Sequence, residues 1–162
     1  MLHERLGQNG YTQRFTDLFL QGLSETDAEI VDVNLSEKQI ATCLGCYHCW
    51  FSPEGECVQH DDMDELLAEF ITADTIVCAT PVYYYSLSSQ LQAFLERSLP
   101  LTKAGLATTP SGLFRNKTRH TWGWEGKSIV FIAVAALRSM ENFTPLQDTC
   151  RLIAEALDLR LG

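Results

Sequence analysis

The sequence lacks long hydrophobic runs and is poor in basic residues. No purely apolar stretch approaches the roughly 20 residues that a helix needs to cross a bilayer. Lysine and arginine together number 12 against 21 acidic residues, which gives a formal net charge of −9. Phosphate backbones repel such a chain, which argues against general nucleic-acid binding. The first residues, Met1 to Arg5, have no apolar signal core, so we expect a soluble, cytoplasmic protein without membrane contact.

The sequence also lacks internal repeats and low-complexity segments. Its 162 residues are 46% hydrophobic and 20% charged, which is an ordinary composition for a globular protein. A chain of this length buries about two-thirds of its unfolded surface and folds without covalent crosslinks. We therefore expect a single domain over residues 1–162, with a cysteine-rich loop inserted at about 43–60.

Four of the six cysteines are clustered: Cys43, Cys46, Cys49 and Cys57. Their spacing is C-x2-C-x2-C-x7-C, and intervening glycines and a proline permit a tight loop. Structural zinc usually takes two C-x2-C pairs that lie far apart. Three cysteines at consecutive three-residue steps favour an iron–sulfur cluster, as in the ferredoxin pattern. The spacing thus favours a [4Fe–4S] site, with zinc or a loop of free thiols as the alternatives.

Strand and helix patterns alternate along the chain. Helical periodicity marks residues 12–23, 63–72, 88–99 and 144–159, and strand patterns mark 29–33, 75–79 and 128–136. The last two strands are apolar throughout, which is typical of strands buried on both faces of a parallel sheet. Residues 100–126 look like a polar excursion. The alternation predicts an α/β fold with a parallel sheet.

Three segments are expected at the edge of the sheet where ligands bind in such folds. The turns 80–89 and 135–142 follow buried strands, and the cysteine loop comes a few residues after another strand. Ligands of open α/β sheets bind at the carboxyl ends of the strands. The rings of Tyr83, Tyr84 and Tyr85 can stack on a planar cofactor, or they simply cover the sheet edge.

An ordered series of motifs follows the cysteine cluster. Asp61-Asp62-Met63 begins a helix, and an apolar strand then leads into the turn Thr80-Pro81-Val82-Tyr83. The next helix carries Phe94-Leu95-Glu96-Arg97 near its end. In this order the motifs resemble the NAD(P)H-dependent FMN reductase-like family of flavodoxin-fold proteins, and most closely the iron–sulfur flavoproteins within it.

The resemblance implies a flavodoxin-like three-layer αβα fold, bound FMN, and NAD(P)H as co-substrate. It also implies that the four cysteines ligate a [4Fe–4S] cluster that relays single electrons to the flavin. No catalytic side chain is expected, because the flavin performs the chemistry and the protein positions it. The residues that the resemblance assigns to cofactor binding are Arg5, Gln8, Asn9, Gly10, Tyr11, Thr12, Thr80, Pro81, Val82, Tyr83, Tyr84, Ser86, Ala135 and Ala136.

Two parts of the family pattern are shortened in this sequence. Only Met1–His3 stand where the first, central strand belongs, and Glu4–Gly7 replace most of the usual phosphate loop. After the last helix the chain continues only to Gly162, where a fifth strand and helix belong. We therefore expect a sheet that lacks most of its first strand and its last β-α unit, as in a fragment. Weakened phosphate binding and a homo-oligomer are expected as well.

The leading functional hypothesis is an FMN-dependent oxidoreductase that reduces quinones, flavins or small electrophiles. One alternative is a non-catalytic iron–sulfur flavoprotein that carries electrons to a redox protein partner. Another is a cofactor-free homologue whose cysteine loop binds zinc or nothing. Trp122 and Trp124 are expected to pack against the sheet, with covering a flavin or a dimer partner as the alternatives. Basic residues of the polar excursion suit either a nicotinamide phosphate or a solvated loop: Lys103, Arg115, Lys117, Arg119 and Lys127.

Overall fold

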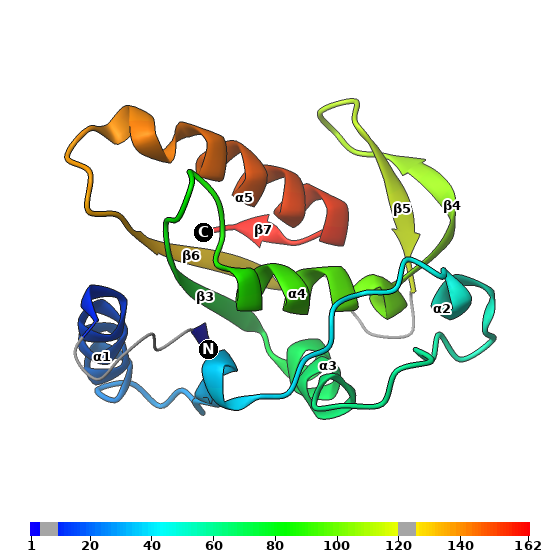
Figure 1. Cartoon of the computed structure of the whole chain (residues 1–162), viewed down its shortest axis with the longest axis horizontal. Helices are drawn as coiled ribbons and strands as arrows, with labels where there is room; N and C mark the ends of the chain where they lie inside the picture. Colours follow the sequence, from blue (N-terminus) through cyan, green and yellow to red (C-terminus); the bar gives the residue numbers. More distant parts are fainter. Residues whose placement is uncertain (4–9, 120–125) are drawn as a thin grey trace.

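The protein is built on a parallel β-sheet (Figure 1). The computed structural model describes residues 1–3, 10–119 and 126–162. The strand order is β2-β1-β3-β6-β7, and every neighbouring pair is parallel. This order matches the flavodoxin arrangement and confirms the predicted fold. The strands are β1 (Leu2–His3), β2 (Val33–Asn34), β3 (Thr75–Pro81), β6 (Ser128–Val134) and β7 (Arg160–Leu161).

The expected shortening appears as strands of two residues. Leu2 of β1 pairs with Val33 on one side and with Cys78 on the other, so the central position of the sheet is filled. The strand predicted over 29–33 begins only at Val33, because β1 offers it just two partner residues. At the far edge, β7 pairs with the first residues of β6, so the chain does contribute the start of a fifth strand.

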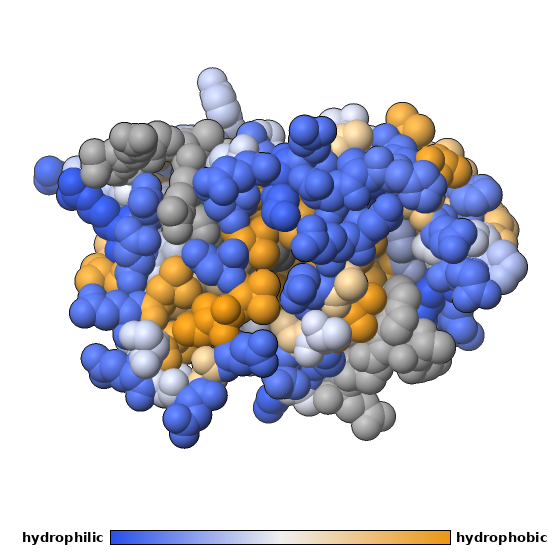
Figure 2. Space-filling model, turned by 90° about the horizontal axis from the view of Figure 1, so that it is seen from below, coloured by the Kyte–Doolittle hydropathy of each residue, from blue (hydrophilic) through white to orange (hydrophobic). Residues whose placement is uncertain are grey.

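The helices cover the sheet unequally. Side chains of α3 (Met63–Thr72), α4 (Ser89–Arg97) and α5 (Thr144–Leu157) share one buried core with Ile76, Cys78 and Ile129 of the strands. Helix α1 (Tyr11–Leu23) packs on β3 and β6, but its side chains are not part of that core. Apolar surface is visible on the underside of the molecule (Figure 2). No helix among the described residues is long and apolar enough to span a membrane.

Helix α1 differs in detail from its prediction. The helix begins at Tyr11 with Gly10 as its N-cap residue, and its buried side chains are Thr12 and Thr16. The larger apolar side chains of Phe15 and Leu18 are 52% and 65% exposed.

The predicted polar excursion is a β-hairpin. Strands β4 (Thr102–Thr108) and β5 (Phe114–Thr118) pair antiparallel and form a second, two-stranded sheet. These strands were not predicted, because half of their side chains are exposed and the sequence shows no alternation of apolar residues there. The tryptophans predicted to pack at 122 and 124 lie outside the described residues.

The basic residues of this region do not form one patch. Arg115 pairs with Asp158 at 2.9 Å, and Lys127 donates to the Ala73 carbonyl at 2.9 Å and also to the Ile71 carbonyl. Arg119 instead points to the cysteine loop, where it donates to the Cys49 carbonyl at 2.7 Å. Neither a shared nicotinamide-phosphate site nor a simple solvated loop describes these three cations.

Candidate functional site

A cavity of about 990 Å³ opens at the carboxyl ends of β3 and β6, beside the first turn of α1. In the strand order β2-β1-β3, the chain passes from one side of β1 to the other, so the topological switch point lies between β1 and β3. Ligands bind at this point in open α/β sheets, because the loops there diverge and leave a crevice. The cavity therefore lies where the fold predicts a ligand.

Most of the residues that the sequence assigned to cofactor binding line this cavity: Gly10, Tyr11, Thr12, Pro81, Val82, Tyr83, Tyr84, Ala135 and Ala136. Two others do not line it. Thr80 is fully buried, and Ser86 donates its backbone N–H to the Tyr83 carbonyl at 3.0 Å and closes the tyrosine turn. Arg5, Gln8 and Asn9 lie outside the described residues.

The cavity wall also contains Tyr85, whose ring was one of the stacking candidates, and five residues that were not predicted: Gln13, Phe15, Val134, Leu137 and Asn142. The position of Phe15 was detectable, since it lies one helical turn after Tyr11 on the same face of α1. Leu137 and Asn142 follow β6, as Ala135 and Ala136 do. Their place in the wall depends on the path of the chain after the strand, which the sequence does not show.

The turn after β3 presents aromatic rings in a strained backbone. Tyr84 and Tyr85 have φ values of 47° and 65°, in the left-handed region that bulky residues rarely adopt. Tyr84 is 98% exposed. The buried Thr80 side chain holds both ends of the turn: its hydroxyl accepts the Ser88 N–H at 3.0 Å and donates to the Pro81 carbonyl. Strain of this kind, about 1–3 kcal/mol per residue, persists where surrounding contacts enforce it and is concentrated at functional sites.

The opposite end of the cavity is the N-terminus of α1. Gly10 is the N-cap, and no side chain among the described residues caps the helix. Backbone N–H groups of the first turn therefore point out of a 13-residue helix without an internal acceptor. Together with the positive end of the helix dipole, they make a site suited to a phosphate group.

The four clustered cysteines lie near one another in a loop that surrounds the short helix α2 (His48–Phe51). All four are free thiols: Cys49 is buried, Cys46 exposed, and the other two are half-buried. Burial raises the pKa of Cys49, and the nearby Cys57, Cys43 and Cys46 raise it further. Within the described parts of the chain, no three His, Cys, Asp or Glu side chains are close enough to hold a single metal ion. The predicted metal site therefore stays a prediction.

Two features of the loop fit an iron–sulfur group. The Gly45 N–H donates to the Cys43 Sγ at 3.5 Å, which is the kind of hydrogen bond that stabilises cluster sulfur. The Arg97 side chain interacts with Cys57, and its Nε atom is buried and has no hydrogen-bond partner among the described residues. A donor in this position suits an added sulfur acceptor.

Comparison with known proteins shows the family to which the chain belongs. Residues 4–143 match the family described as NADPH-dependent FMN reductase. An iron–sulfur flavoprotein of Archaeoglobus fulgidus is 38% identical over 91 residues, which cover 56% of this chain and 40% of that protein. An FMN-dependent NADH:quinone oxidoreductase of Rhizobium meliloti is 27% identical over 176 residues, covering 95% of this chain and 82% of that protein.

Among solved structures, an FMN-dependent NADH-azoreductase from Bacillus anthracis in complex with FMN superposes with a TM-score of 0.67. It is 13% identical, and the match covers 99% of this chain and 83% of the azoreductase. At this identity the likeness shows the fold alone. The chain spans about half the length of the iron–sulfur flavoproteins that it matches. Because the family match extends over residues 4–143, the chain belongs to the NADPH-dependent FMN reductase family.

Proposed function

We propose that the cavity binds FMN and that the protein is an NAD(P)H-dependent FMN oxidoreductase acting on a quinone, a flavin or another small electrophile. The observation that carries this proposal is the cavity at the switch point of a flavodoxin-like sheet, with an uncapped helix N-terminus at one end and a tyrosine turn at the other. Relatives named as FMN-dependent NADH:quinone oxidoreductases support the same reaction class.

Each wall of the cavity has a distinct role in this proposal. The N–H groups at the start of α1 receive the phosphate, and the turn Pro81–Tyr84 lies along the flavin ring. Ala135 and Ala136 approach the ring from β6, where a small side chain leaves room for it. Bound FMN supplies the chemistry, because it accepts a hydride from NAD(P)H and delivers two electrons to the acceptor. The protein's own part would be to hold the phosphate at the start of α1 and the ring between the tyrosine turn and the two alanines.

FMN binding is tested with a substitution that fills the cavity. Ala135→Trp places an indole in the space assigned to the flavin, and Ala104→Trp makes the same change at an exposed position of β4, away from the cavity. FMN is titrated against each variant and the dissociation constant is measured from flavin fluorescence. We expect Ala135→Trp to weaken binding at least tenfold and Ala104→Trp to leave it unchanged. Equal binding by both variants, or none by the wild type, contradicts the FMN site.

The reaction itself needs a separate assay. The FMN-loaded protein is mixed with NADH or NADPH and a quinone, and nicotinamide oxidation is followed by absorbance. Steady oxidation supports the reductase. Reduction of the flavin by dithionite but not by either nicotinamide supports instead an electron carrier that takes its electrons from a protein partner.

We further propose that the four clustered cysteines hold a [4Fe–4S] cluster, which relays electrons one at a time. Their spacing, the N–H···S contact at Cys43, and relatives named iron–sulfur flavoproteins support this. The test is anaerobic reconstitution followed by analysis for iron, sulfide and zinc. Iron and sulfide in equal amounts, lost in Cys46→Ser but not in Cys150→Ser, support the cluster. Zinc alone, or no metal, contradicts it.

A further inference from the structure

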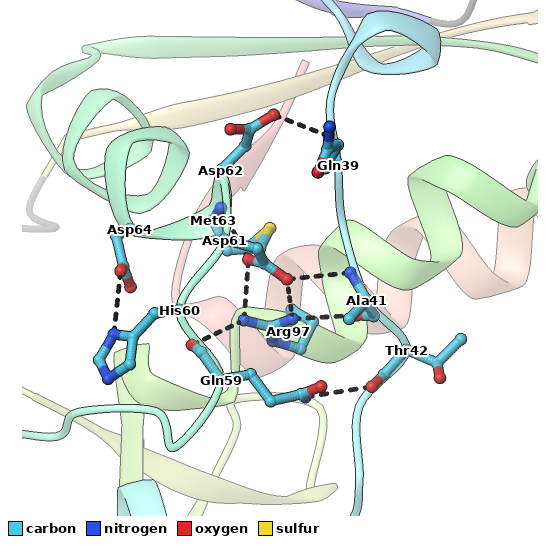
Figure 3. A network of polar contacts seen from close by, with 10 residues as sticks. All are labelled: Gln39, Ala41, Thr42, Gln59, His60, Asp61, Asp62, Met63, Asp64 and Arg97. Carbon is cyan, nitrogen blue, oxygen red and sulfur yellow. Dashed lines mark hydrogen bonds and ion pairs between the residues drawn. The ribbon is translucent and has the colours of Figure 1, made fainter.

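The largest charged side chain in the interior is not at the cavity. Arg97, in the last turn of α4, is only 2% exposed. Its guanidinium forms a two-pronged ion pair with Asp61, with Nη1–Oδ2 at 2.6 Å and Nη2–Oδ1 at 3.0 Å (Figure 3). It also donates to the carbonyl of Ala41 at 3.0 Å and to that of Gln59 at 3.3 Å. A buried guanidinium needs this many acceptors, because removing the charge from water is otherwise costly.

These acceptors bracket the cysteine loop. Ala41 lies two residues before the first clustered cysteine, and Gln59 and Asp61 lie just after the last. The two ends are also joined directly: Asp61 Oδ2 accepts the Ala41 N–H at 2.9 Å, and Gln59 Nε2 donates to the Thr42 carbonyl at 3.1 Å (Figure 3). Arg97 therefore lies at the stem of the loop and ties both of its ends to α4.

The same guanidinium reaches the cysteine site. The Cys57 thiol is one of the groups that interact with this side chain. Its Nε–H is buried and has no acceptor among the described residues, and a buried donor without an acceptor is destabilising. A sulfur acceptor at the cysteine site would remove that penalty.

We propose that Arg97 is a positioning residue for the cysteine site: it fixes the stem of the loop and gives the sulfur at Cys57 a hydrogen-bond donor. The inference rests on the proposed [4Fe–4S] site and names the group that prepares the loop for it. Hydrogen bonds to cluster sulfur stabilise the reduced state, which carries one more electron. Arg97 therefore both arranges the ligands before the cluster binds and raises the reduction potential afterwards.

The test compares Arg97→Lys with Arg151→Lys. Lysine keeps the positive charge but loses the fork that binds both oxygens of Asp61. Arg151 supplies a matched control, because its i,i+4 pair with Glu155 is exposed on α5. The double variant Asp61→Asn/Arg97→Gln separates loss of the ion pair from misfolding caused by an unpaired buried charge. It removes both charges and leaves no unpaired carboxylate.

The first readout is hydrogen exchange in the metal-free protein. We expect Arg97→Lys to speed amide exchange at least tenfold in segments 39–43 and 57–63, while α5 exchanges as in the wild type. The double variant should show the same local loss. Unchanged exchange in these segments overturns the inference, and so does equal acceleration throughout the double variant, because Arg97 then supports the whole fold and not the loop.

The second readout uses reconstituted protein. We expect Arg97→Lys to take up several-fold less iron and sulfide than Arg151→Lys. The reduction potential of its remaining clusters should be lower by 59 mV, which is a tenfold change in the equilibrium constant for one electron. Equal loading and equal potential overturn the inference. If even the wild type takes up no iron, the cluster proposal fails by itself, and the exchange experiment still decides whether Arg97 holds the loop.

Discussion

The substitution Gly55→Ala isolates the second anchor of the cysteine loop. Gly55 has φ +78°, and a Cβ atom there would lie 2.5 Å from Nε and 2.8 Å from Cζ of Arg119. Gly45, in the same loop, has φ +62° but nothing within 4 Å of such an atom. Alanine at either position costs about 1–2 kcal/mol for the left-handed backbone. At Gly55 it must also displace a guanidinium that holds the Cys49 carbonyl at 2.7 Å.

The additional cost follows from what Arg119 does. It also donates to the Pro100 carbonyl at 3.0 Å and to the Pro53 and Ser52 carbonyls at 3.3 Å. Losing one good hydrogen bond from a charged group destabilises by about 1.5–3 kcal/mol. We therefore expect Gly55→Ala to lower the free energy of opening the loop by roughly that amount more than Gly45→Ala does. At about 1.4 kcal/mol per factor of ten, the loop should then open roughly 10- to 150-fold more often.

The assay is the alkylation rate of Cys49 in the metal-free chain, measured by mass spectrometry. This thiol is 7% exposed, and burial raises its pKa, so opening the loop both uncovers it and favours the reactive thiolate. Equal rates in Gly55→Ala and Gly45→Ala would refute the anchoring role of Arg119. In an Arg119→Ala background the clash is gone, and Gly55→Ala should then cost no more than Gly45→Ala does.

Three further outcomes are expected. Burial alone would raise the pKa of Asp61, but hydrogen bonds from its buried arginine partner and from backbone N–H groups hold it below its usual value. Ionised Asp61 therefore stabilises the fold at pH values above its unfolded pKa of about 4, and this contribution is lost as the pH falls further. Urea titrations should show a smaller loss of unfolding free energy on acidification in Asp61→Asn than in the wild type. Burial raises the pKa of Cys78 to about 12, so iodoacetamide at neutral pH should label exposed Cys46 and spare Cys78; equal labelling would contradict the burial. Thr80→Val leaves the buried N–H at the start of α4 without its acceptor and should cost about 1–3 kcal/mol in urea unfolding, whereas Thr75→Val, which loses an exposed hydroxyl contact, should cost under about 0.5 kcal/mol.

The local hydrophobic pattern of the sequence was enough to predict the strands and helices that face the core. The apolar runs at 75–79 and 128–136 are strands β3 and β6, and the Asp-Asp-Met motif begins α3 at Met63, whose N–H is accepted by Asp61 Oδ1 at 3.0 Å. Burial on both faces demands continuous hydrophobicity, which the sequence displays directly. The hairpin at 102–118 had no such signal, because half of its strand side chains are exposed and its pairing is held by backbone hydrogen bonds.

The sequence by itself determined the chemistry available to this protein: four thiols at cluster spacing, tyrosines after a buried strand, and the motif order of the family. Only the tertiary structure decided which residues act together. Arg97 pairs with Asp61, which lies 36 residues away in the sequence, and Arg119 donates to the carbonyl of Cys49, which lies 70 residues away. In the sequence Arg97 is the last residue of a family motif and Arg119 is one of several basic residues, and neither context identifies a partner. Their function comes from acceptors that the folded chain brings to them, and hydrophobic periodicity carries no information about such long-range polar contacts.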